Sequence, residues 1–211
     1  FMPIGPAGAS PMVLLARADL PAANLREFVA WAAKNKAKAS YGSAGVGSIS
    51  HYGCVLLLSS LGQNVTHIPY KGVAPAMNDL MGGQTDFMCD QTTTALPQLA
   101  GGRIKAIAVL SNARLPQLPG VATAAESGYA LDIRSWNAFF ALRGTPPPVL
   151  AKLTAALQHA VGDAALRKQM EGLGVELPAP AQATGAAVSA RIARGLREDV
   201  PALKAKSEYL D

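Results

Sequence analysis

The chain has 211 residues, of which 50% are hydrophobic and 16% are charged, so it can bury a sizeable core as one large domain or two small lobes. Its formal net charge of +5 suits an anionic ligand, yet aromatic residues make up only 6% and no basic stripe is interleaved with them. Nucleic acid is therefore not an expected partner. No apolar run reaches the roughly 18 residues that a membrane-crossing helix needs.

The first half of the chain has a βαβ rhythm. Helices are predicted at 24–33 with Asn24 as N-cap, at 48–62, around Pro75 up to the Gly82-Gly83 pair, and at 93–99. Between them, strands are predicted at 12–16, bounded by Pro11, and at 39–42, 65–69, 85–89 and 104–110. This alternation predicts a largely parallel sheet covered by helices.

The pattern changes after Pro116 and Pro119. A short helix at 122–127 and an extended segment at 133–142 are followed by a helix that opens at Pro147 or Pro148 and runs to 161, and by helices at 164–173 and 184–205. A helix-rich tail behind a complete βαβ lobe predicts two lobes with a crossover and a ligand cleft between them.

The most informative stretch is Tyr-Gly-Ser-Ala-Gly-Val-Gly-Ser at 41–48, which leads from a strand end through a glycine turn into a helix N-terminus. The first amides of a helix have no intrahelical partner, and the helix dipole is positive there, so the junction is suited to an anion. Residues 39–70 contain no Asp, Glu, Lys or Arg, so neutral dipoles would hold that anion. The turn residues predicted to bind ligand are Ser43, Ala44, Gly45, Val46, Gly47 and Ser48.

The alternative is that this turn only reverses the chain, as glycine-rich turns often do in α/β proteins. Both phosphate fingerprints fit poorly, because no Lys-Ser or Lys-Thr follows the last glycine and the spacing is not G-x-G-x-x-G. A small carboxylate is therefore a better candidate than a phosphate chain.

Four residues outside the turn are further ligand candidates, two of them with a structural alternative. His67 could donate to a ligand or be a structural hydrogen-bonding residue. Asp90 could receive a polar group of the solute or cap local backbone amides. Tyr70 and Trp136 suit cleft walls, because each has an apolar face and one donor. His51 lies one turn into the helix, where a packing role is equally consistent.

The two cysteines, Cys54 and Cys89, lie among apolar residues, where buried free thiols and a disulfide are both possible. No ligand spacing indicates a metal site, and no cofactor is expected.

Three motifs resemble the Bug proteins, the periplasmic solute-binding components of tripartite tricarboxylate transporters. They are the 41–48 turn with His51, the Thr-His-Ile-Pro-Tyr-Lys-Gly-Val-Ala-Pro-Ala run at 66–76, and Asp-Leu-Met-Gly-Gly-Gln at 79–84. The likeness continues through the Gly-Gly-Arg-Ile-Lys run at 101–105 and Leu-Pro-Gly-Val at 118–121 to Gly-Thr-Pro at 144–146, over essentially the whole chain.

The resemblance implies an α/β fold of the type II periplasmic-binding-protein class, with one complete βαβ lobe plus the C-terminal helical part of a second lobe. Residues 1–10 would be a remnant of the first lobe, 11–134 the second lobe, and 135–211 the crossover strand and C-terminal helices of the first lobe. It also implies that the chain starts after the family's N-terminal segment, so that ligand binding by this chain is weak.

By the same resemblance the protein is not an enzyme; it is periplasmic, and its partners are a small carboxylate ligand and the membrane permease subunits of the transporter. The runner-up is the effector-sensing domain of a transcription regulator, which shares the two-lobe architecture. A Ser-His-acid hydrolase is a third and weaker hypothesis, because the G-x-S-x-G elbow is absent.

Overall fold

The structure is a computed structural model that describes residues 1–35 and 37–204, and the chain divides into two compact units. Of the described residues, unit 1 holds 1–10 and 136–204, and unit 2 holds 11–35 and 37–135. The predicted helix end at Ala205 and the predicted C-terminal stretch 205–211 lie outside the described residues. None of the described helices combines the length and apolar character that a bilayer span requires.

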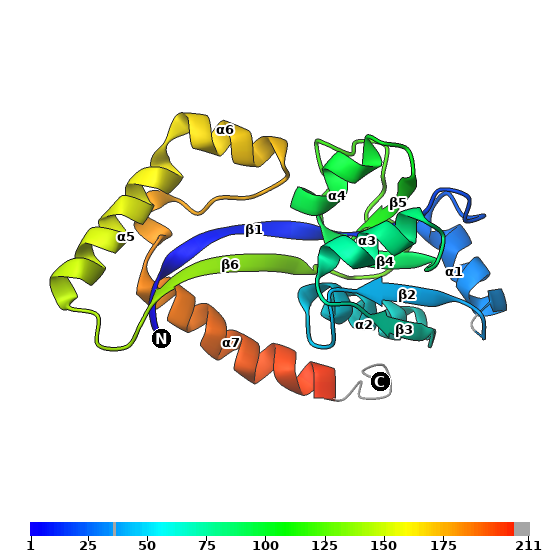
Figure 1. The fold of residues 1–211 in the computed structure, drawn as a ribbon, viewed down its shortest axis with the longest axis horizontal. Coiled ribbons are helices and arrows are strands. Elements are labelled where there is room, and N and C mark those ends of the chain that lie inside the picture. Colours follow the sequence, from blue (N-terminus) through cyan, green and yellow to red (C-terminus); the bar gives the residue numbers. More distant parts are fainter. Residues whose placement is uncertain (36, 205–211) are drawn as a thin grey trace. The chain divides into compact units, whose positions relative to one another are not determined.

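Unit 2 is an α/β unit whose sheet has the order β3-β2-β4-β1-β5 (Figure 1). Two long strands belong to both units, β1 (Met2–Arg17) and β6 (Arg134–Ala141), and β6 pairs with β1. The remaining elements of unit 2 are α1 (Leu25–Asn35), β2 (Ser40–Ser43), α2 (Ile49–Leu61), β3 (Thr66–Pro69), α3 (Val73–Met81), β4 (Phe87–Gln91), α4 (Thr92–Leu99), β5 (Ile104–Val109) and the 3₁₀ helix η1 (Ala125–Ser127).

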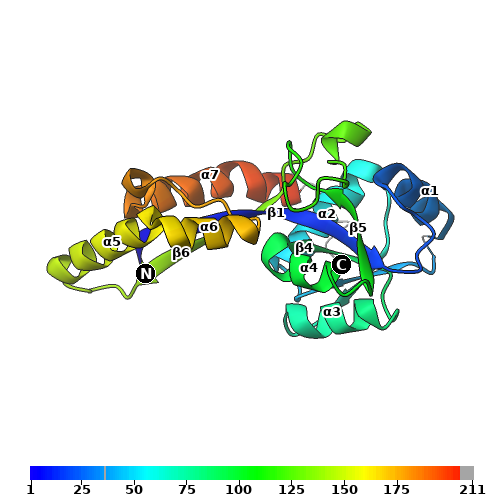
Figure 2. The same ribbon diagram turned by 90° about the horizontal axis from the view of Figure 1, so that it is seen from above.

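Both faces of this sheet are buried. Along β1, Leu14 and Ala16 lie in a core with the side chains of α1 and α2, whereas Val13 and Leu15 lie in a second core with those of α3 and α4. Successive side chains of a strand point to opposite faces, so a continuous apolar run is what a strand covered on both faces requires. Figure 2 shows α3 on the opposite side of the sheet from α1 and α2.

Two predictions about the sheet are wrong. The strands β2, β3 and β4 pair in parallel, but β1 lies antiparallel between β4 and β5, so the sheet is mixed where a largely parallel one was predicted. The first strand also begins at Met2 and passes through Pro11, which was predicted to bound it. Proline removes one donor but is compatible with extended backbone where that donor is not needed.

The predicted helix ends in unit 2 are largely confirmed. Asn24 accepts a hydrogen bond from the Glu27 amide at 3.0 Å, and Ser48 is the N-cap of α2. Gly62 ends α2 in the left-handed conformation with φ of 62°, which glycine adopts without a steric penalty. The short helix predicted at 122–127 is reduced to one 3₁₀ turn, η1.

Unit 1 is helical around the N-terminal part of β1. Its helices are α5 (Pro147–Gly162), α6 (Ala164–Gly172), the 3₁₀ helix η2 (Pro180–Gln182) and α7 (Gly185–Lys204). Ile4, Leu157, Val161 and Ala183 form its small buried core. A Cβ at Gly5 would lie 2.7 Å from the Leu157 side chain, so only glycine lets β1 approach α5 this closely.

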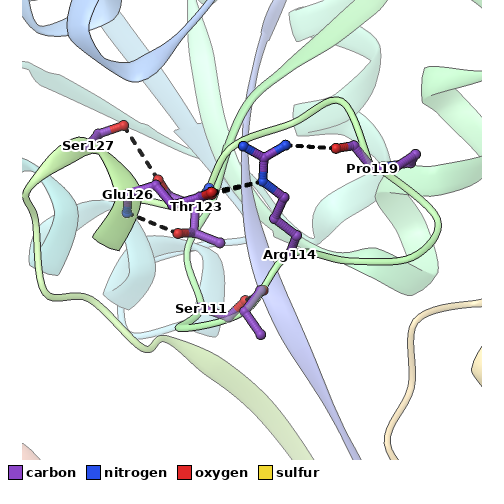
Figure 3. Close-up of polar contacts among 7 residues, drawn as sticks. Ser111, Arg114, Pro119, Thr123, Glu126 and Ser127 are labelled. Carbon is purple, nitrogen blue, oxygen red and sulfur yellow. Dashed lines mark hydrogen bonds and ion pairs between the residues drawn. The ribbon is translucent and has the colours of Figure 1, made fainter.

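The excursion between β5 and β6 is held by a polar network around Glu126 (Figure 3). The Thr123 amide donates to the Glu126 carboxylate at 2.7 Å, and the Glu126 amide donates to the Thr123 hydroxyl at 3.1 Å, which is a capping box. Arg114 donates to the same carboxylate at 3.0 Å and to the Pro119 carbonyl at 2.9 Å. One carboxylate thereby links Arg114, early in the excursion, to Thr123.

This network predicts an acid-sensitive contribution to stability. The bond from the Thr123 amide, with smaller contributions from Arg114, lowers the pKa of Glu126 below its usual 4.5. A depressed folded-state pKa contributes stability above pH 4.5, and that stability is lost as the pH falls through the folded pKa. Glu126→Gln should therefore lower the melting temperature at pH 7 and reduce its further fall below pH 4.5, as measured by thermal unfolding. Equal pH profiles for the variant and the parent would contradict this role.

Candidate functional site

The candidate site is the turn that joins β2 to α2 in unit 2. Ser43 ends β2, and Ser48 accepts the His51 amide at 3.3 Å to cap α2. Gly45 and Gly47 have φ of 118° and 77°, which side chains with a Cβ rarely adopt. The end of β3 lies against the turn, because the Tyr70 amide donates to the Ser43 carbonyl at 3.0 Å. The positive φ values at Gly45 and Gly47 therefore require glycine at both positions.

Most amides of the turn have acceptors within the protein, so the predicted open cradle of free amides is wrong in part. The Ala44 amide donates to the Ser50 hydroxyl at 2.8 Å, and the Gly45 amide donates to the Ser43 hydroxyl at 3.1 Å. The Gly47 amide donates to Nδ1 of His51 at 3.1 Å, and the Ser48 amide donates to the Gly45 carbonyl at 3.1 Å. The physical reason is that a half-buried turn must satisfy its donors, and neighbouring hydroxyls and an imidazole are within reach.

Three amides at the turn and at the start of α2 are unpaired among the described residues. Within the described part of the chain, the amides of Val46, Ile49 and Ser50 have no protein acceptor. Ile49 and Ser50 are the first residues of α2, where the helix dipole adds positive potential. Val46 is 71% exposed and Ile49 is partly exposed, whereas Ser50 is only 1% exposed, so the open part of this region is at Val46 and Ile49. A small anion could thus accept hydrogen bonds from the tip of the turn and from the helix terminus together.

A stack of three rings lies beneath the turn. The ring centroids of Tyr41 and His67 are 4.8 Å apart, and those of His67 and His51 are 4.1 Å apart. Nε2 of His67 lies 2.6 Å from the Ser43 hydroxyl, while Nδ1 of His51 accepts the Gly47 amide. The stack therefore supports the turn at two points, through Ser43 and through Gly47.

Burial keeps both imidazoles neutral. It lowers the pKa of His67 to about 4, with His51 adding to the shift, and it lowers the pKa of His51 as well. Because Nδ1 of the neutral His51 accepts a hydrogen bond, the proton sits on Nε2. That nitrogen is buried and has no partner among the described residues. His51 is thus a positioning residue of the turn, a role that the sequence left open.

Tyr70 donates its hydroxyl to Asp79 at 2.7 Å, and burial together with Asp79 raises the pKa of Tyr70 to about 12. The Asp79 carboxylate thus fixes the direction of the phenol. Lys71, next along the chain, is exposed. The contact of Tyr70 with a ligand stays a prediction.

Asp90 lies inside β4, where the sequence had placed it just beyond the strand. It is 3% exposed, and it accepts bonds from the Gln91 amide and the Thr94 hydroxyl at the start of α4. Burial raises its pKa to about 6, and those two hydrogen bonds oppose the shift. The observed contacts are those of a local cap, and a direct contact of Asp90 with ligand stays a prediction.

Trp136 belongs to unit 1 and not to the unit that carries the turn. There it lines a cavity of about 610 Å³, with Arg191 and Arg194 also in the lining, and the Arg191 guanidinium lies 5.5 Å from the centre of the Trp136 ring. The sequence alone did not single out either of these arginines. Only the fold brings α7 beside the tryptophan.

The structure brings the turn residues together with His67, His51 and Tyr70 in unit 2. The described residues contain no cluster of His, Cys, Asp or Glu that could hold a metal ion. Ser43 and His67 do form a Ser-His pair. However, the Ser43 side chain is fully buried, so its hydroxyl serves the turn and is closed to a substrate.

The sequence comparisons place the chain in one family. The family model described as "Tripartite tricarboxylate transporter family receptor" matches residues 1–194, and the chain belongs to this family, TctC. A UPF0065 protein of Agrobacterium vitis is 36% identical over 189 residues, 89% of this chain and 55% of that protein. A UPF0065 protein of Bordetella pertussis is 38% identical over 177 residues, 83% and 55% respectively. The chain thus spans about half the length of these curated relatives.

Solved structures agree with this assignment. The periplasmic binding protein BugD matches with a TM-score of 0.93 and 39% identity, over 98% of this chain and 69% of that one. MatC from Rhodopseudomonas palustris, solved with bound malate, matches with a TM-score of 0.88 and 32% identity, over 100% and 70%. The predicted α/β binding-protein fold and Bug resemblance are confirmed, and the members of this family are solute-binding receptors, not enzymes.

The ring stack predicts a pH dependence of stability. The folded state keeps His67 neutral down to about pH 4, whereas the unfolded chain takes up a proton below about pH 6.5. Stability should therefore be fully present above pH 6.5 and fall as the pH drops from 6.5 to 4. In urea titrations His67→Phe should show a smaller fall over this interval than the parent protein.

The exposed His159 on α5 gives a matched control, because His159→Phe removes an imidazole that supports no turn. This control should keep the parent's slope. The comparison isolates His67 from Asp90, whose raised pKa acts in the opposite direction between pH 3.8 and about 6. If His67→Phe and the parent lose stability in parallel, the stack does not act as described.

Proposed function

We propose that this chain is part of an extracytoplasmic receptor that binds a small carboxylate and presents it to the membrane permease subunits of a tripartite tricarboxylate transporter. The observation that carries the proposal is the N-terminus of α2, where the amides of Val46, Ile49 and Ser50 have no protein acceptor in the described chain. Family membership and the malate bound by the 32% identical MatC support a carboxylate as the solute.

The chemistry of the turn favours a carboxylate over a bulkier phosphate chain. Two or three amides and a helix dipole suffice for one carboxylate group, and residues 39–70 contain no basic side chain that would neutralise further charges. Neutral donors also allow the ligand to leave again, because no buried ion pair has to be broken. A receptor that hands its solute to a permease requires such reversible binding.

Unit 2 corresponds in this proposal to the second lobe of a two-lobed receptor, and unit 1 to part of the first lobe. Closure of the lobes around the solute would then shift the population toward a closed state that the permease recognises. Tyr70 and Trp136 would be walls of the cleft. The runner-up, an effector-sensing domain of a transcription regulator, has no support in the family match, which describes a transporter receptor. A periplasmic location follows from the same proposal, since relatives such as BugD are periplasmic binding proteins.

The site predicts which amides respond to ligand. When malate is titrated into ¹⁵N-labelled protein, the amide resonances of Val46 and Ile49 should shift most, because their N–H groups gain a charged acceptor. The diamide of malate, which has the same skeleton without the charges, is the control and should leave them unchanged. Shifts confined to other residues would reject this site, and no shift with any mono- or dicarboxylate would reject the function.

A glycine substitution tests the shape of the turn. A Cβ at Gly45 would lie 3.1 Å from the Tyr70 carbonyl oxygen, and φ of 118° strains any residue with a Cβ. Gly45→Ala should therefore weaken carboxylate binding by about tenfold or more, the equivalent of one lost charge-assisted hydrogen bond. Gly102, in the turn after α4 with φ of 67°, is the matched control. Gly102→Ala should cost stability but leave the affinity in calorimetry within about twofold.

A further inference from the structure

The two cysteines meet in the core of unit 2. Cys54 lies on α2 and Cys89 on β4, and both are fully buried in the same hydrophobic cluster. Their sulfur atoms are 2.8 Å apart. Two non-bonded heavy atoms rest at about 3.5–4.0 Å, so the side chains already point at one another at less than the usual contact distance.

The backbone around the two thiols also suits a covalent bond. A Cβ built at Gly53 would lie 3.2 Å from Cβ of Cys89, which shows that α2 approaches β4 closely at this point and that glycine makes the approach possible. Disulfides need such proximity, because their Cβ atoms are about 3.5–4.5 Å apart. Gly53, which has no Cβ, therefore lets α2 come close to Cys89 at the residue before Cys54.

The contacts of the described residues indicate no other function for this pair of thiols. No cluster of His, Cys, Asp or Glu there could hold a metal ion, and both thiols are closed to solvent. Burial raises the pKa of Cys89, with Cys54 adding to the shift, so the thiolate that reacts is scarce once the core has closed. Oxidation therefore belongs to the folding reaction, before the core excludes the oxidant.

We propose that Cys54 and Cys89 form an intramolecular disulfide during folding in an oxidising compartment. One thiol loses its proton and attacks the disulfide of an oxidant, either a small-molecule disulfide or a protein disulfide donor, and releases one thiol of that oxidant. The second cysteine then loses its proton and displaces the remaining oxidant thiol. The two cysteines lose two electrons and two protons in total, and the oxidant's disulfide is reduced to two thiols.

The bond would fix the helix that carries the candidate site. Cys54 lies six residues after Ser48, about 9 Å along the helix axis, so a bond to β4 anchors α2 close to its N-terminus. The amides of the first turn would then keep their position relative to the sheet when the solute enters or leaves. The assignment of an oxidising compartment rests on the proposed function, whereas the reaction itself depends only on the two thiols and a disulfide oxidant.

Refolding in a glutathione redox buffer tests the disulfide. The denatured protein is refolded with reduced and oxidised glutathione, quenched with acid and assayed for thiols and for intact mass. The refolded protein should expose no free thiol when denatured again and should be about 2 Da lighter than the reduced form. Peptide mapping should show residues 54 and 89 in one cross-linked pair. Two remaining thiols, or only dimers linked between chains, would overturn the proposal.

Stability gives a second readout, with Cys54→Ser/Cys89→Ser as the matched control. The oxidised protein should melt about 5–15 °C above its reduced form, as expected for a cross-link that closes a loop of this length in a chain of this size. The double variant should fold and show no response to reductant. A disulfide in a protein that binds no carboxylate would leave this inference intact and reject only the function proposed above.

Discussion

The contact between α2 and the sheet is the interaction on which the candidate site depends. Residues such as Cys54, Leu57 and Leu58 are buried against β2 and β4, and Gly53 lets the helix backbone come close to β4. Burial of this apolar run holds the axis of a helix that has no charged residue of its own. Its N-terminus is thereby held at the end of β2, and the direction of its unpaired amides is set by packing, not by the ligand.

The polar groups around that N-terminus form a network without formal charge. Ser43, Ser50 and His51 accept amides of the turn, and His67 supports Ser43 from below. Each buried donor that finds an internal acceptor avoids a desolvation penalty of about 1–3 kcal/mol. The network therefore fixes the turn and leaves only a few donors for a solute. The number of free donors limits how many oxygen atoms of a ligand this unit can bind.

Local patterns predicted most of the secondary structure because the deciding interactions are themselves local. Asn24, Ser48 and Gly62 act within one helical turn of the ends they cap, and the continuous apolar run of β1 follows from burial of both sheet faces. Pattern reasoning failed for Pro11 and for the direction of β1, because pairing with β4, β5 and β6 is decided by residues far along the chain. Parallel and antiparallel strands have no distinct local signal when both faces are buried.

The sequence by itself determined that residues 41–48 are a glycine turn at a capped helix, that residues 39–70 contain no Asp, Glu, Lys or Arg, and that the chain resembles solute-binding receptors. Only the tertiary structure decided how the turn is supported, because His67 on β3 lies against the Ser43 hydroxyl that accepts the Gly45 amide. The same holds for Arg191 beside Trp136 and for the meeting of Cys54 with Cys89. Each of these contacts joins residues at least 24 positions apart, a separation that no local pattern encodes.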